Sequence, residues 1–544
     1  MFLKKTYSKN HIYLSIVETF RDDGKVKHRT IGHLGRLDEL QQNDQIKRLV
    51  DSLLRVCDGE KPLQINQLRE VDRVNWGASR VYRALWNKFD LDGALISLLK
   101  KRRVRFGFSE TVFLETISRL ASPCSKLKLH KTQGIYNGAE PSQLQHLYRA
   151  LDILAQGKDY LEEWLFNKNC SLFNMTVDVV FYDVTTFYFE SVKPDELKDF
   201  GYSKDCKFGE VQVVMGLLID TEGRPVGFDI YPGKTFEGST LEAALHKLKN
   251  RFQIREVVIV ADRGINSKLN LKKVRDAGFH YIVGSRLKKM KQDVQKDVLD
   301  LAKYHSTIFE DGTEIRHRVL DYNNVICFQD ENDVKQEVTL AERLVCTWTT
   351  ERAEKDRKDR DRLVQKAHKM LEKGSYKDSS RGARRFIKTT PKVAKASLDD
   401  DAIAKEARWD GYYGIQTSHQ NLSAQDVANA YRCLWRIEES FRIFKTTLET
   451  RPMFHWSPQR IRGHLVLCFI AFLLQRTLEL ELSSIGNAAS PEAIRDAINS
   501  LNLSVIEHDG ELHYLRSTVA DLSTVILRLL KIKIPKPISL PKDF

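Results

Sequence analysis

The sequence predicts an α/β protein: a mixed sheet with flanking helices, interrupted by a β-rich insertion and preceded by an N-terminal helical region. Strand-like runs and amphipathic helices alternate from residue 176 to about 290, which indicates the sheet. From about 290 to 425 the alternation gives way to short β-like pieces and a very charged helix, which indicates the insertion. Amphipathic helical segments dominate residues 66–170.

Two segments precede the predicted sheet. Residues 1–65 are expected to form a β-like arm, because the runs HIYLSIVETF and KHRTIGHLG flank the turn-forming residues 21–24. Residues 66–170 are expected to be helical, with amphipathic segments such as SETVFLETISRLA. Between these helices lies a basic cluster that includes Lys101, Arg102 and Arg103. The cluster suits phosphate contact, and a solvated helix end explains it equally well.

Residues 171–290 are predicted to form the first part of the sheet domain. The run VDVVFYDVTTFYFE is a strand, and VQVVMGLLID and PVGFDIYPG follow as a hairpin. A helix (STLEAALHKLKNRF), a strand (REVVIVADRG), a helix (LKKVRDAG) and a strand (HYIVGSRL) come next. Three strands in series, followed by helix, strand, helix and strand, predict a mixed sheet.

The remaining chain divides into three predicted parts. Residues 291–425 form the β-rich, basic insertion, with strands TEIRHRVLDYN, NVICFQD and ERLVCTWTT and the helix ERAEKDRKDRDRLVQKAHKMLEKG. Residues 426–485 return to the core with an amphipathic helix and the apolar helix HLVLCFIAFLL. Residues 486–544 are expected to form a helical tail.

The composition favours a nucleic-acid partner. Lys and Arg number 87 against 73 Asp and Glu, a net charge of +14, which suits a polyanion. No apolar run reaches the roughly 18 residues of a membrane span, and the N-terminus lacks the pattern of a signal peptide. The eight cysteines contain no CxxC pair, which indicates a reducing compartment. Together these observations lead us to expect a cytoplasmic protein that contacts no membrane.

Two aspartates occupy positions in strands where a carboxylate is costly. Asp183 lies inside the apolar strand FYDVTTFYF, and Asp262 ends the strand VVIVADRG. A buried carboxylate costs several kcal/mol unless it is paired or binds a metal. An Asp that closes a strand of an α/β sheet is commonly a site residue. The structural alternatives are an edge-strand Asp that faces water and an Asp that caps the following turn.

A third acid, Glu438, belongs to the predicted helix YRCLWRIEESFRIFK. Tyr431, Glu438 and Lys445 are seven residues apart, almost two helical turns, so a continuous helix aligns them on one face. Glu438 is expected at the edge of the apolar stripe, and Glu439 is expected to be turned about 100° further away. The stripe consists of Leu434, Ile437, Phe441, Phe444 and Leu448.

The three acids together predict a metal site. Asp183, Asp262 and Glu438 supply hard oxygen ligands, which suit two Mg²⁺ ions about 3.5–4 Å apart. Such a pair promotes in-line attack at phosphorus, so a basic protein with this site is predicted to act on phosphodiesters. A carboxylate pair also serves glycoside hydrolysis, but a sugar substrate leaves the net charge of +14 unexplained.

Four segments resemble the bacterial insertion-sequence DDE transposases: YDVTTFYFES, GRPVGFDIYPGKTFEGSTL, VVIVADRGINS and YRCLWRIEESFRIFK. They occur in the family's order, and the resemblance extends over roughly residues 10–480. It is closest to the subgroup with a ribonuclease-H-like core, a β-rich insertion and a Tyr-Arg-Glu-Lys helix signature. The resemblance assigns the catalytic, metal-binding roles to Asp183, Asp262 and Glu438.

The same resemblance assigns further residues. Tyr431 and Lys445 match the signature Tyr and Lys and would contact DNA, whereas Leu434 stands at the signature Arg position. Arg442, one turn after Glu438, is the candidate substitute. Trp348 is the insertion's candidate for stacking on a DNA base, with core packing as the alternative. Three polar residues beside the aspartates are candidates to orient them, or simply pack there: Thr185, Thr186 and Arg263.

The resemblance implies DNA cleavage at the ends of an insertion element, followed by strand transfer into target DNA. It implies Mg²⁺ as cofactor, with Mn²⁺ as a substitute, and residues 66–170 as the region that binds the terminal repeats. It also implies a homodimer on double-stranded DNA at the bacterial nucleoid. Two alternatives stay open: a non-catalytic DNA-binding protein of the same fold, which Leu434 favours, and a metal-dependent nuclease that joins no ends.

Overall fold

The computed structural model divides into two compact units, which are described separately. Unit 1 contains Met1–Asp72, Ser504–Leu515 and Pro537–Phe544, and unit 2 contains Arg73–Leu503 and Arg516–Lys536. No helix within the described residues is long and apolar enough to cross a membrane. The structure describes all residues except 43, 57–68, 101, 174–177, 191, 202–208, 237–238, 255–256, 309–313, 330–334, 375–381, 391–394, 452, 509 and 544.

Unit 1 contains the predicted N-terminal strands and a second sheet that the sequence did not predict. Strands β1 (Phe2–Ser8), β2 (His11–Asp22) and β3 (Lys25–Arg36) pair antiparallel, and helices α1 (Leu37–Gln42) and α2 (Gln45–Val56) follow. The second sheet has the order β18-β17-β16-β4. Its strands are β4 (Arg69–Asn75), β16 (Asn502–His508), β17 (Glu511–Arg516) and β18 (Ile538–Ser539). The C-terminal tail, expected to be helical, therefore also contains strands, which pair with β4 from a distant part of the chain.

One nine-stranded sheet runs through unit 2, in the order β10-β11-β12-β15-β9-β8-β5-β6-β7. Its core strands are β5 (Val179–Tyr188), β6 (Gln212–Ile219), β7 (Pro225–Pro232), β8 (Val258–Ala261) and β9 (His280–Gly284). β5, β6 and β7 are antiparallel, whereas β5, β8 and β9 are parallel. The predicted mixed sheet is confirmed.

Helices α8 (Leu241–His246) and α9 (Lys268–Asp276) cover one face of this sheet. Tyr182 and Val184 of β5, Ala261 of β8 and Val283 of β9 pack with them in one core. Side chains alternate between the faces of a strand, so the neighbours of these residues in sequence point to the opposite face. Helices α13 (Ala424–Arg432) and α14 (Trp435–Arg442) pack on β5, β8 and β9.

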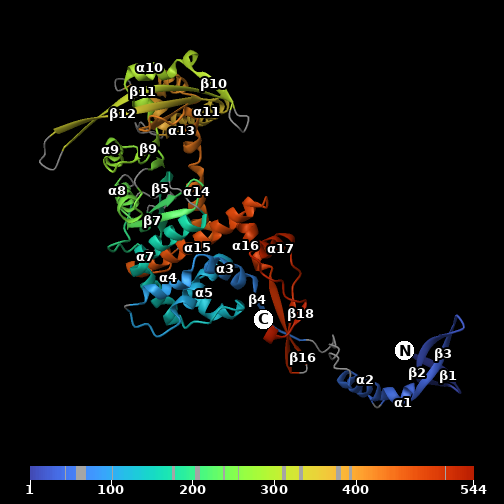
Figure 1. Ribbon diagram of the computed structural model, residues 1–544. Helices are drawn as coiled ribbons and strands as arrows, with labels where there is room; N and C mark the ends of the chain where they lie inside the picture. The colour runs from blue at the N-terminus through green and yellow to red at the C-terminus, as the bar shows by residue number, and fades with distance from the viewer. Residues whose placement is uncertain are drawn as a thin grey trace. The chain divides into compact units, whose positions relative to one another are not determined.

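The helical region surrounds a long apolar helix, α15 (Pro458–Ser484), which is buried along most of its length. It packs against α3 (Gly77–Lys88), α5 (Phe108–Ala121), α7 (Leu144–Phe173) and strand β7 (Figure 1). This explains how a helix without a polar face remains stable in water. The other helices here are α4 (Leu91–Leu98), α6 (Lys126–Thr132), α16 (Pro491–Asn499) and α17 (Asp521–Leu529).

The insertion extends the core sheet. Strand β12 (Lys335–Trp348) pairs with β15 (Tyr412–Thr417), which pairs with β9 of the core. The predicted strands TEIRHRVLDYN and NVICFQD prove to be one long strand, β11 (Glu314–Gln329), which pairs with β12 and β10 (His305–Ile308) (Figure 1). The other elements are α10 (Gln292–Leu299), the charged α11 (Thr350–Glu372), α12 (Asp400–Ala407), β13 (Ile387–Thr390) and β14 (Lys395–Leu398).

A buried carboxyl group, Glu342 of β12, joins the insertion to the core. It accepts hydrogen bonds from Tyr281 Oη of β9 and Gln416 Nε2 of β15, and from Asn324 Nδ2 of β11 at 3.1 Å. Burial raises the pKa of Glu342 above its usual value, although the three donors oppose that rise. The folded chain therefore binds a proton at Glu342 more tightly than the unfolded chain.

This shift predicts a pH dependence. Stability should fall as the pH rises from about 4.3, the unfolded pKa of a Glu, through the raised folded pKa, at no more than about 1.4 kcal/mol per pH unit. Glu342→Gln should lose this dependence, because Gln does not titrate. Urea unfolding between pH 4.5 and 8 measures both slopes, and Glu337→Gln, an exposed position on the same strand, is the control. Equal slopes in all three proteins would contradict the prediction.

Candidate active site

The parallel pairing of β5 and β8 aligns the two predicted aspartates. Its register matches Val179 with Val258 and Phe181 with Val260. Asp183 and Asp262 stand two residues further along each strand, so they share a face of the sheet and lie opposite each other. Neighbouring strands are about 4.8 Å apart, a separation that lets two carboxylates share a ligand. Asp183 is half-buried and Asp262 is exposed.

Both aspartates point to the face opposite α8 and α9. Phe181 and Val260 lie between residues that pack against those helices, so their own side chains point to the opposite face. Asp183 and Asp262 stand two residues further along the same strands and therefore point to that face as well. Gly284, on β9, belongs to the same face. A Cβ atom there would lie 2.5 Å from Tyr431 Oη, so α13 approaches the sheet beside Asp262. Tyr431 therefore lies beside the end of β9.

The surroundings of Asp262 are well ordered. Its Oδ1 accepts a hydrogen bond from the Gly264 amide at 2.6 Å, so the turn-capping alternative is correct for one oxygen. Tyr413 Oη donates to Tyr431 Oη at 2.6 Å. Burial, Tyr413 and the nearby charge of Asp262 together raise the pKa of Tyr431 above its usual range, so its hydroxyl stays protonated.

The predicted continuous helix through Tyr431, Glu438 and Lys445 is wrong. The chain is helical in three segments: α13 ends at Arg432, α14 contains Glu438, and the π-helix η8 (Ile443–Thr447) contains Lys445. Between α13 and α14 the hydrogen bonds tighten, with Leu434 N bonded to Tyr431 O at 3.1 Å. A tight turn and a π turn rotate the chain by different amounts from an α-helix, so a seven-residue spacing no longer aligns side chains.

The exposures of the two glutamates on α14 also differ from the prediction. Glu438 is exposed, whereas Glu439 is half-buried and accepts hydrogen bonds from both terminal nitrogens of Arg476 at 3.1 Å. Arg476 lies on α15 and is only 8% exposed. The expectation that Glu439 turns away from the buried face is therefore wrong. Because Glu439 anchors α14 to α15, Glu438 is the acid of this pair that remains available.

The three acids do not form a closed metal-binding cluster. Among the residues that the structure describes, no group of three or more His, Cys, Asp and Glu side chains is arranged to hold a metal ion. The sheet aligns Asp183 with Asp262, and α14, which contains Glu438, packs on the strand of Asp183.

Other predicted residues lie in varied surroundings. Trp348 donates from Nε1 to Asp410 O at 3.1 Å, and its indole fills the space beside Gly411, so its ring has a packing role. Arg442 is 70% exposed and lies 3.8 Å from Glu439. Arg102 and Arg103 lie between α4 and α5, as expected, and Arg102 donates to Gln156 Oε1 at 2.7 Å. Lys101 lies outside the described residues.

The structure reveals a cationic cluster that the sequence analysis missed. The guanidinium carbons of Arg263 and Arg352 lie 4.8 and 4.4 Å from the centre of the Tyr413 ring. Arg286 donates to Arg263 O at 2.9 Å. These residues come from the core and from α11 of the insertion, so no local pattern connects them. The basic run at the end of β9, GSRLKK, was the available signal.

A cavity of about 190 Å³ lies against this cluster. The hydroxyl of Ser285 on its wall is buried and has no hydrogen-bond partner among the described residues. Cations and an unpaired buried donor suit an anionic ligand such as a phosphate. The cavity is lined by Arg263, Ser285, Arg286, Leu287, Lys288, Lys289, Trp409, Tyr412, Tyr413 and Gly414.

Comparison with known proteins decides the family. The model of the transposase DDE domain matches residues 177–474, more than half of the chain, and includes all three predicted acids. The chain belongs to the DDE transposase family. The model of the IS1634 family transposase N-terminal domain matches residues 3–63 of this transposase.

Two further comparisons add less. None of the curated proteins compared with the transposase matches it significantly. Among solved structures, the Mos1 transposase paired-end complex with left transposon end matches with a TM-score of 0.15 and 11% identity. That match covers 34% of this chain and 60% of the Mos1 chain.

The packing at Gly284 gives a testable prediction. In Gly284→Ala, the new Cβ would lie 2.5 Å from Tyr431 Oη and 2.8 Å from Arg263 Cγ, so the side chains beside Asp262 must move. We expect a loss of about 1–3 kcal/mol in the free energy of unfolding, measured by urea denaturation. Gly134→Ala is the control, because no atom lies within 4 Å of a Cβ there. If both variants are equally stable, the close approach of α13 to β9 is incorrect.

Proposed function

We propose that this transposase cuts DNA at the ends of its insertion element and joins the freed 3′ ends to target DNA. The observation that carries the proposal is the register of β5 and β8, which aligns Asp183 with Asp262 at the end of β8. The family match supports phosphodiester chemistry at these residues. The net charge of +14 supports DNA as the substrate.

The donor set fits a divalent metal. Asp183 and Asp262 would hold an ion between them, and Glu438 would be the third ligand. Carboxylate oxygens suit Mg²⁺, with Mn²⁺ as a substitute. When bound, such ions polarise the phosphoryl oxygen and lower the pKa of water. Two ions at the site are part of the proposal.

The residues of the chain itself position the DNA. Arg263, Arg286 and Arg352 around Tyr413 are proposed to bind backbone phosphates beside Asp262, because guanidinium groups match phosphate geometry. Tyr431 and Lys445 are proposed to contact the phosphates nearest the carboxylates, with Arg442 in place of the Arg that Leu434 replaces. The ion pair of Glu439 with Arg476 keeps α14 in place while DNA binds.

The proposal extends to assembly. Residues 66–170, including Lys101, Arg102 and Arg103, are proposed to recognise the terminal repeats. Holding two DNA ends together requires two copies of the chain, so we propose a homodimer on DNA, acting at the nucleoid in the cytoplasm. Static light scattering with and without a paired-end DNA substrate tests this assembly.

The carboxylates provide the main test. Asp183→Asn, Asp262→Asn and Glu438→Gln should each lower the cleavage rate about a thousandfold on a plasmid with the element's own ends, because each removes an aligned charge. DNA binding, measured by gel shift, should be unchanged. Glu439→Gln is the matched control: it should weaken the packing of α14 and lower thermal stability.

Three results would decide among the alternatives. If binding falls as much as cleavage in the three variants, the acids are structural and a non-catalytic DNA-binding protein is the better interpretation. If the wild type nicks DNA without joining it to target DNA, the protein is a nuclease of this family. If Glu439→Gln abolishes cleavage with unchanged stability, the third acid is Glu439 and not Glu438.

Removal of metal gives an independent prediction. EDTA should abolish cleavage, and excess Mg²⁺ or Mn²⁺ should restore it, because the aligned carboxylates repel each other and a cation relieves that repulsion. For the same reason, Mg²⁺ should raise the melting temperature of the wild type by more than that of Asp183→Asn. Cleavage that persists in EDTA would contradict the metal assignment.

A further inference from the structure

Two aromatic side chains project into solvent from the loop of residues 449–457, which joins η8 to α15. The rings of Phe454 and Trp456 are 65% and 73% exposed. Burying an aromatic ring normally contributes about 1.5–3 kcal/mol, so two adjacent exposed rings forgo a large stabilisation. Paired exposed aromatics on a basic protein are typical of a surface that meets a partner.

Residues on α5 and α15 contact the loop. Arg119 of α5, itself only 8% exposed, donates to Leu448 O at 3.2 Å and to Glu449 O at 3.3 Å. Met453 is buried. The ring of His455 lies 4.9 Å from that of His464 on α15. The neighbours of Phe454, Met453 and His455, are therefore packed, while the rings of Phe454 and Trp456 are exposed.

Cations accompany both ends of the loop. Lys198 Nζ lies 5.8 Å from the Trp456 ring centre, and the Arg451 guanidinium lies 5.4 Å from the ring of Tyr188 on β5. Lys198 is only 5% exposed and pairs with Asp195 at 3.3 Å, so Arg451 is the cation of this pair that a phosphate can contact, and Glu449 is an exposed acid beside it. Aromatic rings beside cations match the alternating bases and phosphates of a nucleic-acid strand.

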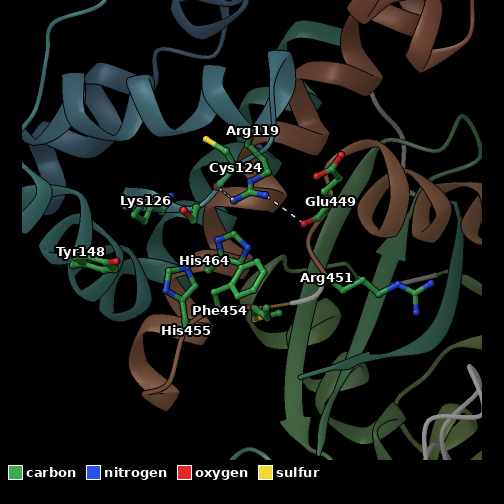
Figure 2. A pocket seen from close by; sticks show the side chains of 11 residues that line it. Arg119, Cys124, Lys126, Tyr148, Glu449, Arg451, Phe454, His455 and His464 are labelled. Atoms are coloured by element: carbon green, nitrogen blue, oxygen red, sulfur yellow. Dashed lines mark hydrogen bonds between the residues drawn. The ribbon is translucent and has the colours of Figure 1, made fainter. Parts of the chain in front are cut away.

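A cavity of about 110 Å³ beside Phe454 is lined by the rings of Tyr148, His455 and His464 and by four charged residues, Arg119, Lys126, Glu449 and Arg451. Figure 2 shows Phe454 beside His455 and His464, with Arg451 directed away from both histidines. Burial lowers the pKa of His455 to about 3 and that of His464 well below its usual value, so both rings are neutral at pH 7. Lys126 in its wall is paired with buried Glu115 at 2.9 Å.

The loop contacts the far end of the strand that contains Asp183. Arg451 rests over Tyr188, which is five residues beyond Asp183 on the same strand. At about 3.4 Å per residue, the two positions are on the order of 17 Å apart along β5, and their odd spacing directs the two side chains to opposite faces of the sheet.

We propose that Phe454 and Trp456, which lie between η8 and α15, bind unpaired DNA bases. Phe454 and Trp456 stack on the bases, while Arg451 contacts an adjoining phosphate. The inference rests on the proposed function, since it assumes that DNA reaches the neighbouring carboxylates. It adds a single-strand site outside the insertion, whose Trp348 is engaged in packing.

The test compares single-stranded with duplex DNA. Fluorescein-labelled oligo(dT) and a labelled blunt duplex are titrated with full-length protein in EDTA, and affinity is read by fluorescence anisotropy. Phe454→Ala/Trp456→Ala should bind oligo(dT) at least about fivefold more weakly for each ring removed, as expected when about 1–3 kcal/mol of base stacking is lost per ring. Its affinity for the blunt duplex should stay within about twofold of the wild type.

Two matched variants accompany the double substitution. Trp456→Phe retains a ring and should keep most of the affinity for oligo(dT). Tyr160→Ala removes an exposed aromatic from α7 and should bind both DNAs like the wild type. Circular dichroism melting should be unchanged in every variant at the loop, because exposed rings contribute little to folding.

Three results would overturn the proposal: unchanged binding of oligo(dT) by the double variant, an equal loss for both DNAs, or loss of self-association with unchanged DNA binding. The last would show that the rings contact a second copy of the chain. Binding in EDTA does not depend on cleavage, so failure here leaves the function of the carboxylates open. Conversely, the wild type could fail to cleave DNA while removal of the two rings still weakens binding of oligo(dT). That result would refute only the proposed catalysis.

Discussion

The parallel pairing of β5 with β8 is the constraint on which the candidate site depends. Strand register is rigid, because a slip of one residue would move every side chain of β8 to the opposite face. The three apolar pairs from Val179–Val258 to Phe181–Val260 therefore determine where Asp183 and Asp262 emerge. Apolar packing against α8 and α9 maintains the register, so the site inherits its geometry from the hydrophobic core.

Helices α13 and α14 cover the face of the sheet to which Asp183 and Asp262 point. α13 is held close by Tyr431, which fits over Gly284, and α14 is held by the ion pair of Glu439 with the buried Arg476. Between them the chain tightens at Leu434, and beyond them it widens into a π-helix. Such irregular turns occur frequently at functional sites. Glu438 thus belongs to a short helix anchored by its neighbour.

The insertion contributes to the site as well as to the sheet. Through β12 and β15 it continues the core sheet, and buried Glu342 ties the strands together with three hydrogen bonds. Arg352 of α11 reaches Tyr413 beside Arg263 of the core. A positive surface next to Asp262 is therefore built jointly by two segments that are well separated in the sequence.

The sequence by itself determined the types and order of most elements, the basic character and the candidate acids, because periodicity, turn residues and costly carboxylates are local signals. Only the tertiary structure decided which of Glu438 and Glu439 is engaged by Arg476, where the helix breaks at Leu434, and which cations gather at Tyr413. It also decided that β4 joins the C-terminal strands in one sheet. These features arise from contacts between distant residues, whose energies override local helix periodicity and leave no trace in any short segment.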